Sequence, residues 1–288
     1  MNLRLDRFAT LYLASPWRLL AGEKRCMIPV LMYHSIGNED HSGRHAYFQT
    51  AVSPETFSEQ MEHLHRGGYR TCTPAEAVAL LASSAGTGER IVVITFDDGY
   101  RDFYFHAFPV LSQFRFSATV FLPTSYIGRS AKDFKGRKCL TWPEIRELQR
   151  HGMAFGSHTV SHPQLRTLDR VAIEKELTDS KKAIEDSTGL PVESFAYPYA
   201  FPQVDIEFRR MLRSVLQAAG YRSGVCTIVG RTSPDSDPYF LERLPVNDAD
   251  DAALFEAKLR GAYDWVGWLQ STAKKVRSVH AGLEPAEL

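Results

Sequence analysis

Short apolar segments alternate with amphipathic segments along most of this chain. The clearest apolar segment is residues 91–94, four β-branched residues in succession, which is typical of a strand buried on both faces of a parallel sheet. The other predicted strands are residues 26–34, 117–122, 153–158, 195–199, 222–228 and 239–246. This pattern favours a sheet whose strands are separated by helices.

The segments between these strands carry helix signals. Ser53 and Pro54 are a typical N-cap and first helical residue, and Phe57, Met61 and Leu64 follow with the spacing of one apolar helix face. Capping residues or apolar spacing predict further helices at residues 73–81, 103–114, 141–152, 173–189 and 208–219. The alternation predicts one parallel α/β domain, either barrel-like or doubly wound.

The two ends of the chain differ from this repeating part. We expect an N-terminal extension at residues 1–25, one domain at residues 26–248 and a helical tail at residues 249–288. Within the tail, Trp265, Trp268, Leu269 and Val276 are spaced to share a helix face, and packing against the domain is favoured over sugar binding.

Composition adds limits on function. The 288 residues include 34 basic and 34 acidic side chains. The formal net charge is therefore zero, and the composition gives no indication of a nucleic-acid partner. The four cysteines are scattered without a Cys-x-x-Cys spacing, which favours reduced thiols in a cytoplasmic protein. Nothing indicates the oligomeric state.

The N-terminal extension carries five basic and two acidic residues, a net charge of +3. Its apolar stretch at residues 8–20 is broken by Ser15, Pro16 and Arg18, so it is too short to span a bilayer. Leu5, Phe8, Leu11 and Tyr12 would share one face of a helix. An amphipathic helix in peripheral contact with the inner membrane is one interpretation, and a helix docked on the domain or a frayed terminus is the favoured alternative.

Polar residues follow two of the predicted strands directly. Asp97 and Asp98 come after residues 91–94, and Gly99 then permits a sharp turn. Successive side chains alternate across a strand, so the two carboxylates diverge and can do different work. The alternative is that the aspartates only cap the helix that follows.

His158 and His162 follow a second predicted strand. Carboxyl ends of parallel strands lie at the same edge of a sheet, so one aspartate and two histidines can form a three-ligand metal site with an open position. The second aspartate is then free to take a proton from a water activated by the metal.

At these positions the chain resembles the NodB-homology polysaccharide deacetylases, carbohydrate esterase family four. Residues 95–99, Thr-Phe-Asp-Asp-Gly, match the first family motif, residues 158–162 the second, and residues 195–199 are similar to the third. The resemblance implies a distorted (β/α) barrel of about seven parallel strands, a divalent metal, most often zinc, and removal of acetyl groups from a sugar. It also implies Asp97 as general base, with Asp98, His158 and His162 as metal ligands and the Tyr199 backbone N–H as an oxyanion donor.

Two positions depart from the family pattern. Ala196 stands where an arginine usually orients the base, and residues 241–247 lack the usual histidine acid. Both features resemble the branch of biofilm poly-N-acetylglucosamine deacetylases, whose first strand ends in Tyr-His, as Tyr33-His34 does here. The resemblance implies that His34 is the general acid, the alternative being a core histidine. Arg243 either replaces the missing arginine or forms an ordinary salt bridge.

The expected activity is metal-dependent removal of N-acetyl groups from an acetamido sugar in a polysaccharide, oligosaccharide or lipid-linked glycan. Trp142 and Tyr197 either line the sugar site or pack in the core. Two other functions stay open: an O-acetyl esterase on the same scaffold, and a glycan-binding module without activity.

Overall fold

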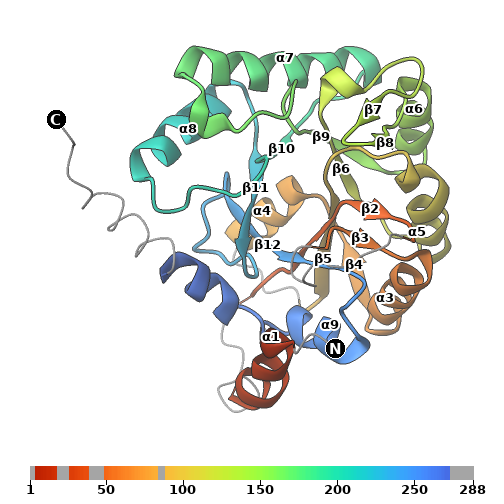
Figure 1. Ribbon diagram of the computed structural model, residues 1–288, viewed down its shortest axis with the longest axis vertical. Coiled ribbons are helices and arrows are strands. Elements are labelled where there is room, and N and C mark those ends of the chain that lie inside the picture. Colours follow the sequence, from red (N-terminus) through yellow and green to blue (C-terminus); the bar gives the residue numbers. More distant parts are fainter. Residues whose placement is uncertain (1–3, 18–25, 39–48, 84–87, 273–288) are drawn as a thin grey trace.

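The computed structural model describes residues 4–17, 26–38, 49–83 and 88–272. Its centre is a closed barrel of seven parallel strands in the order β1-β12-β11-β10-β9-β6-β5, and pairing of β5 with β1 closes the ring (Figure 1). The strands are β1 (Val30–Tyr33), β5 (Arg90–Phe96), β6 (Thr119–Leu122), β9 (Ala154–Ser157), β10 (Ser194–Ala196), β11 (Ser223–Val229) and β12 (Leu241–Pro245). The distorted (β/α) barrel of about seven strands is therefore confirmed.

An eighth parallel strand, β4 (Tyr69–Thr71), lies outside the ring. It pairs with the first half of β5, from Arg90 to Val92, while β1 pairs with the second half, from Val93 to Phe96. β5 is thus longer than its neighbours because two strands share one of its edges.

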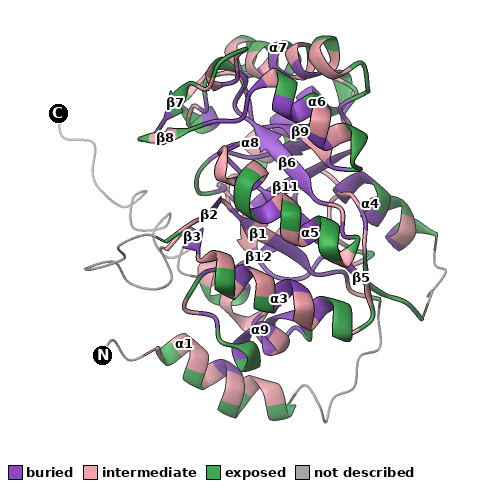
Figure 2. Ribbon diagram, turned by 90° about the vertical axis from the view of Figure 1, so that its right-hand side faces the viewer, coloured by how far each residue is buried: buried purple, intermediate pink, exposed green. Residues whose placement is uncertain are grey.

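Helices surround the barrel, each burying one side against it (Figure 2). The main helices are α3 (Pro54–Arg66), α4 (Pro74–Ala82), α5 (Phe108–Phe114), α6 (Trp142–Arg150), α7 (Arg170–Thr188), α8 (Ile206–Ala218) and α9 (Ala252–Leu259). The predicted capping boxes are present at the starts of α4 and α6, where Thr73 and Thr141 each exchange hydrogen bonds with a glutamate three residues later. None of the described helices has the length and apolar character needed to cross a membrane.

Several short elements complete the structure. They are α1 (Leu5–Phe8), η1 (Ala9–Ala14), η3 (Phe103–Ala107), η4 (Thr124–Tyr126), η5 (Leu165–Thr167), β2 (Ser35–Ile36), β3 (Ala51–Val52), β7 (Asp133–Phe134) and β8 (Arg137–Lys138). The sequence did not predict β4, the β2–β3 pair or the β7–β8 hairpin, because segments of two or three residues show no apolar period. The predicted helix at residues 103–114 begins with the π-helical turn η3.

Side chains of the strands alternate between two buried clusters. Val93 packs with Phe121, Ala196 and Leu241, which come from strands all around the ring, so this cluster fills the barrel interior. Its neighbours along β5, such as Val92, belong to the larger cluster that includes the surrounding helices. Because side chains alternate along a strand, the interior face of β5 leads to Asp97 at the carboxyl end of the barrel.

Candidate metal centre and active site

Asp98, His158 and His162 meet at the carboxyl end of the barrel. Each offers one ligand atom, and these atoms lie within 4.8 Å of one another. Asp98 Oδ1 is 3.2 Å from Nε2 of His162 and 3.6 Å from Nε2 of His158, and all three side chains are buried. The structure thus brings these three residues together, as the sequence predicts.

Both imidazoles direct Nε2 toward Asp98. Nδ1 of His158 lies 2.8 Å from the Ala196 carbonyl oxygen, so it carries the proton and donates it there, which leaves Nε2 with a free lone pair. Burial lowers the pKa of His162, against the opposing effect of Asp98. Burial disfavours ionisation of Asp98, but the adjoining imidazoles of His158 and His162 outweigh it and lower the pKa of that carboxyl.

This donor set fits a divalent transition metal. Two imidazole nitrogens and one carboxylate oxygen are common ligands of catalytic zinc, which keeps a further position open. Among the described residues, only this cluster gathers three such donors. Nδ1 of His162 is buried without a hydrogen-bond partner in the described part of the chain, so hydrogen bonding alone does not account for the arrangement of this ring.

The backbone around the site is held in strained conformations. Four residues have positive φ angles between 57° and 69°, namely Asp98, Thr159, His162 and Tyr199. Residues other than glycine rarely adopt this backbone region. Such strain is maintained only where the surrounding structure fixes the backbone.

Glu176 on α7 supplies part of that fixing. Its carboxylate accepts hydrogen bonds from the backbone N–H groups of Val160 and Ser161 and from the Ser161 hydroxyl, at 2.7–2.9 Å. The Thr159 hydroxyl accepts a bond from the His162 N–H at 2.9 Å. The loop that carries both histidines is therefore anchored to a helix by charge-assisted hydrogen bonds.

Asp97 is held by Arg243, which comes from the interior face of β12. The guanidinium donates two bonds of 2.7 Å, one to each carboxylate oxygen of Asp97. It also donates to the Cys226 carbonyl and the Thr95 hydroxyl, and its side chain is fully buried. Burial disfavours the charge on Asp97, but the Arg243 guanidinium overcomes this and lowers the pKa of Asp97.

His34 follows β1 and faces the same carboxylate. Its Nε2 is 4.0 Å from Oδ2 of Asp97, and 23% of its side chain is exposed. Burial lowers the pKa of His34, although the charges of Asp97 and Asp98 act in the opposite direction. The histidine therefore lies beside the site and has access to solvent, unlike a core histidine.

An aromatic and cationic wall borders the metal centre. The Tyr199 ring is 46% exposed and lies 4.6 Å from the His162 ring, centre to centre. Lys135, at the turn of the β7–β8 hairpin, places Nζ 3.4 Å from Asp98 Oδ2 and 5.3 Å from the centre of the Tyr199 ring. Lys135 and Glu176 were not expected from the sequence, because neither stands in a recognisable motif.

The two aromatic residues proposed for sugar contact both pack against the core. Tyr197 is only 3% exposed, and its ring packs edge-on against Phe201 at 4.9 Å, so it forms part of the core. Trp142 is partly buried against the same core at the start of α6. Tyr197 thus has the core packing that was the alternative to sugar contact, and a sugar contact of the partly buried Trp142 stays a prediction.

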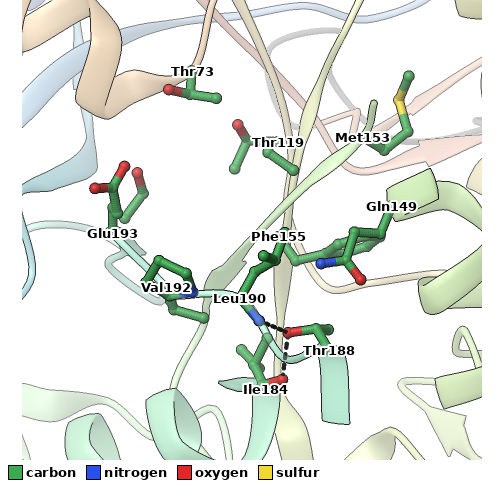
Figure 3. Close-up of a pocket in the computed structure, with 13 residues that line it drawn as sticks. Thr73, Thr119, Gln149, Met153, Phe155, Ile184, Thr188, Leu190, Val192 and Glu193 are labelled. Carbon is green, nitrogen blue, oxygen red and sulfur yellow. Dashed lines mark hydrogen bonds between the residues drawn. The ribbon is translucent and has the colours of Figure 1, made fainter. Parts of the chain in front are cut away.

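A small pocket lies away from this centre (Figure 3). Its volume is about 110 Å³, and it is lined by Thr119, Ala154 and Ser194, which stand at the amino ends of β6, β9 and β10. The proposed ligands lie at the carboxyl ends of strands, so this pocket belongs to the other end of the barrel.

Comparisons with known proteins agree with the geometry. The family model described as polysaccharide deacetylase matches residues 84–224. The Bacillus subtilis (strain 168) protein YxkH, named for the same family, is 32% identical over 235 residues, covering 82% of this chain and 77% of that protein. A poly-beta-1,6-N-acetyl-D-glucosamine N-deacetylase of Staphylococcus aureus (strain MSSA476) is 23% identical over 251 residues, covering 81% of this chain and 83% of that protein.

A solved structure shows the same fold. The Streptococcus pyogenes deacetylase PplD, determined in complex with acetate, superimposes with a TM-score of 0.72 at 24% identity, covering 82% of this chain and 99% of that one. The 32% identity to YxkH over most of both chains, together with the family model, identifies the family. The chain belongs to the polysaccharide deacetylases and is a carbohydrate deacetylase, a hydrolase of carbon–nitrogen bonds other than peptide bonds.

Proposed function

We propose that this protein removes N-acetyl groups from an acetamido sugar within a polysaccharide, oligosaccharide or lipid-linked glycan, with a bound divalent metal. The observation that carries the proposal is the buried cluster of Asp98, His158 and His162 beside Asp97, which Arg243 holds ionised. The name of the S. aureus relative, which acts on poly-N-acetylglucosamine, supports an N-acetylated sugar as substrate.

The three-residue cluster would hold the metal, and zinc is favoured by its two imidazoles and one carboxylate. A divalent metal in such a site polarises a carbonyl group and acidifies water, which supplies the nucleophile at neutral pH. The side chains of this chain then have to move protons and stabilise the oxyanion.

Asp97 is proposed as the general base. Arg243 occupies one lone-pair direction on each carboxylate oxygen, so the others stay free to accept a proton from the attacking water. A carbon–oxygen bond forms at the acetyl carbon, and the Tyr199 backbone N–H is proposed to donate to the resulting oxyanion. Arg243 acts through Asp97 and is a positioning residue in this scheme.

His34 is proposed to protonate the departing amine as the carbon–nitrogen bond breaks. Burial lowers the pKa of His34, which favours the neutral imidazole, so we propose that it receives its proton during the reaction. Asp97 Oδ2, 4.0 Å from Nε2, is the place where the proton from water arrives. His34 then passes this proton to the amine nitrogen. In the overall reaction, water and an amide give acetate and an amine.

The test is acetate release from N-acetylglucosamine oligomers, with and without a chelator, followed by re-addition of zinc. Release should require the metal and should fall by about 10²-fold or more in Asp97→Asn. Asp133→Asn, an exposed carboxylate on β7, is the matched control and should keep full activity. Metal-independent release, or an active Asp97→Asn variant, would contradict the mechanism.

Metal binding can be measured without turnover. Calorimetric titration with zinc should give one site per chain, and His158→Ala should lose it, whereas His106→Ala, which changes an exposed histidine, should bind as the wild type does. Retention of tight zinc binding by His158→Ala would remove the proposed ligand set.

A His34 variant can distinguish N-deacetylation from O-deacetylation. An alkoxide leaving group needs less help from an acid than an amine does, so His34→Ala should impair N-deacetylation more than O-deacetylation. Faster turnover of O-acetylated sugars by the wild type would favour the esterase function.

A further inference from the structure

The N-terminal helical segment, α1 and η1 continued to Trp17, is docked with its polar side inward. Thr10 is fully buried, and its hydroxyl accepts a hydrogen bond from the Trp265 indole at 3.0 Å. Arg7 forms an ion pair with Asp251 at 2.6 Å, and Asp6 accepts a bond from the Tyr263 hydroxyl at 3.0 Å. Polar contacts therefore fix this helix on the C-terminal part of the chain.

The outer side of the same helix is apolar, the reverse of an ordinary surface helix. Tyr12, Leu13 and Trp17 are 62%, 65% and 72% exposed. The neighbouring helical residues 265–272 add Trp268, which is 67% exposed, and Leu269. We call Phe8, Tyr12, Leu13, Trp17, Trp268 and Leu269 the apolar face; Figure 2 shows the N-terminal helix on the outside of the barrel, beside α9.

A groove runs between the two helices of this face. Its volume is about 690 Å³, and its lining includes Leu13, Ala14, Trp17, Ala262, Trp265 and Leu269. Exposure of this many large apolar side chains on two adjacent helices is unusual for a surface that only meets water. The helices are already held by polar contacts, so the apolar face is available to a partner.

Basic residues in the adjoining sequence indicate what kind of partner binds the apolar face. Residues 18–25 follow Trp17 directly and contain three basic residues and one acidic residue, and residues 273–280 follow Thr272 and contain three basic residues and no acidic one. Both helices that carry the apolar face thus lead directly into basic sequence. Aromatic residues with flanking basic residues are typical of segments that lie at the interface of an anionic bilayer.

We propose that the apolar face binds the surface of an anionic phospholipid membrane, with its tryptophans at the level of the headgroups. The start of the N-terminal helix is tied to the loop that follows β12, because Arg4 donates to the Ala249 carbonyl at 2.9 Å. That loop lies at the carboxyl end of the barrel, so the start of the membrane-bound helix lies at the same end of the barrel as the deacetylase centre.

The test is flotation of the full-length, zinc-supplemented protein with vesicles of phosphatidylcholine alone or mixed with phosphatidylglycerol. The protein should float with the mixed vesicles, and high salt should release it. The triple variant Tyr12→Ser, Trp17→Ser, Trp268→Ser should bind about tenfold or more weakly. Its thermal stability should match the wild type because the three side chains are mostly exposed, and its acetate release from soluble oligomers should match because they lie outside the proposed active site.

The matched control is the double variant Phe105→Ser, Leu190→Ser, which removes exposed apolar side chains outside the apolar face and should float normally. Neutralising Lys274, Lys275 and Arg277 together should weaken binding to the mixed vesicles. Failure to float, or equal flotation of the triple variant, would overturn the proposal. A dimer in light scattering that the triple variant loses, without vesicle binding, would instead assign the face to a second copy of the chain.

Discussion

Replacing Arg243 with methionine would test whether a buried ion pair holds the proposed base. The variant removes a guanidinium that is fully buried and leaves Asp97, whose side chain is 4% exposed, without its partner. Two opposite charges about 4 Å apart attract by about 4 kcal/mol at an effective dielectric constant of about 20. Breaking one side of a buried pair typically costs about 3–5 kcal/mol, so both arguments give a similar loss of unfolding free energy.

The assay is urea denaturation at pH 7 in the presence of chelator, so that metal binding does not contribute to stability. Arg243→Met, Asp97→Asn and the double variant form a cycle whose coupling energy isolates the pair. The double variant should be more stable than Arg243→Met alone, because no unpaired charge then stays buried. A loss below about 1 kcal/mol in Arg243→Met, or additive effects in the cycle, would refute the reasoning.

Three further substitutions test the fold. Burial raises the pKa of Asp102 to about 6, although its carboxylate accepts a bond from Ser35; its ionisation therefore destabilises the fold above about pH 6, by about 3 kcal/mol, and the cost disappears as pH falls below about 3.9. Asp102→Asn should accordingly be more stable than the wild type at pH 7, with the difference shrinking toward pH 4, and a pH-independent difference would contradict the raised pKa. Gly156→Ala would place a Cβ 2.5 Å from the Phe121 ring inside the barrel and should lower the free energy of unfolding by about 1–3 kcal/mol; an unchanged urea midpoint would show that the ring moves freely. Thr73→Ala removes the capping box of α4 and should cost about 1 kcal/mol in the same assay, and no loss would mean that water replaces the cap.

The sequence by itself determined the barrel strands, the main helices around them and the motif residues. Apolar runs located the barrel strands, and capping residues located the starts of α3, α4 and α6, because these signals are local. Polar residues at the carboxyl ends of parallel strands converge on one side of the sheet, so the sequence predicted a site of one aspartate with His158 and His162. The family resemblance then selected Asp98 as the ligand.

Only the tertiary structure decided the partners of those residues. Arg243 stands 146 positions after Asp97, and its bidentate bond exists because β12 and β5 both flank β1 in the closed ring. The residues alone left a barrel and a doubly wound sheet open, and pairing of β1 with β5 makes the barrel. Lys135 and Glu176 reach the site from a hairpin and a helix for the same physical reason: contacts between distant segments depend on how the chain closes, which no local pattern records.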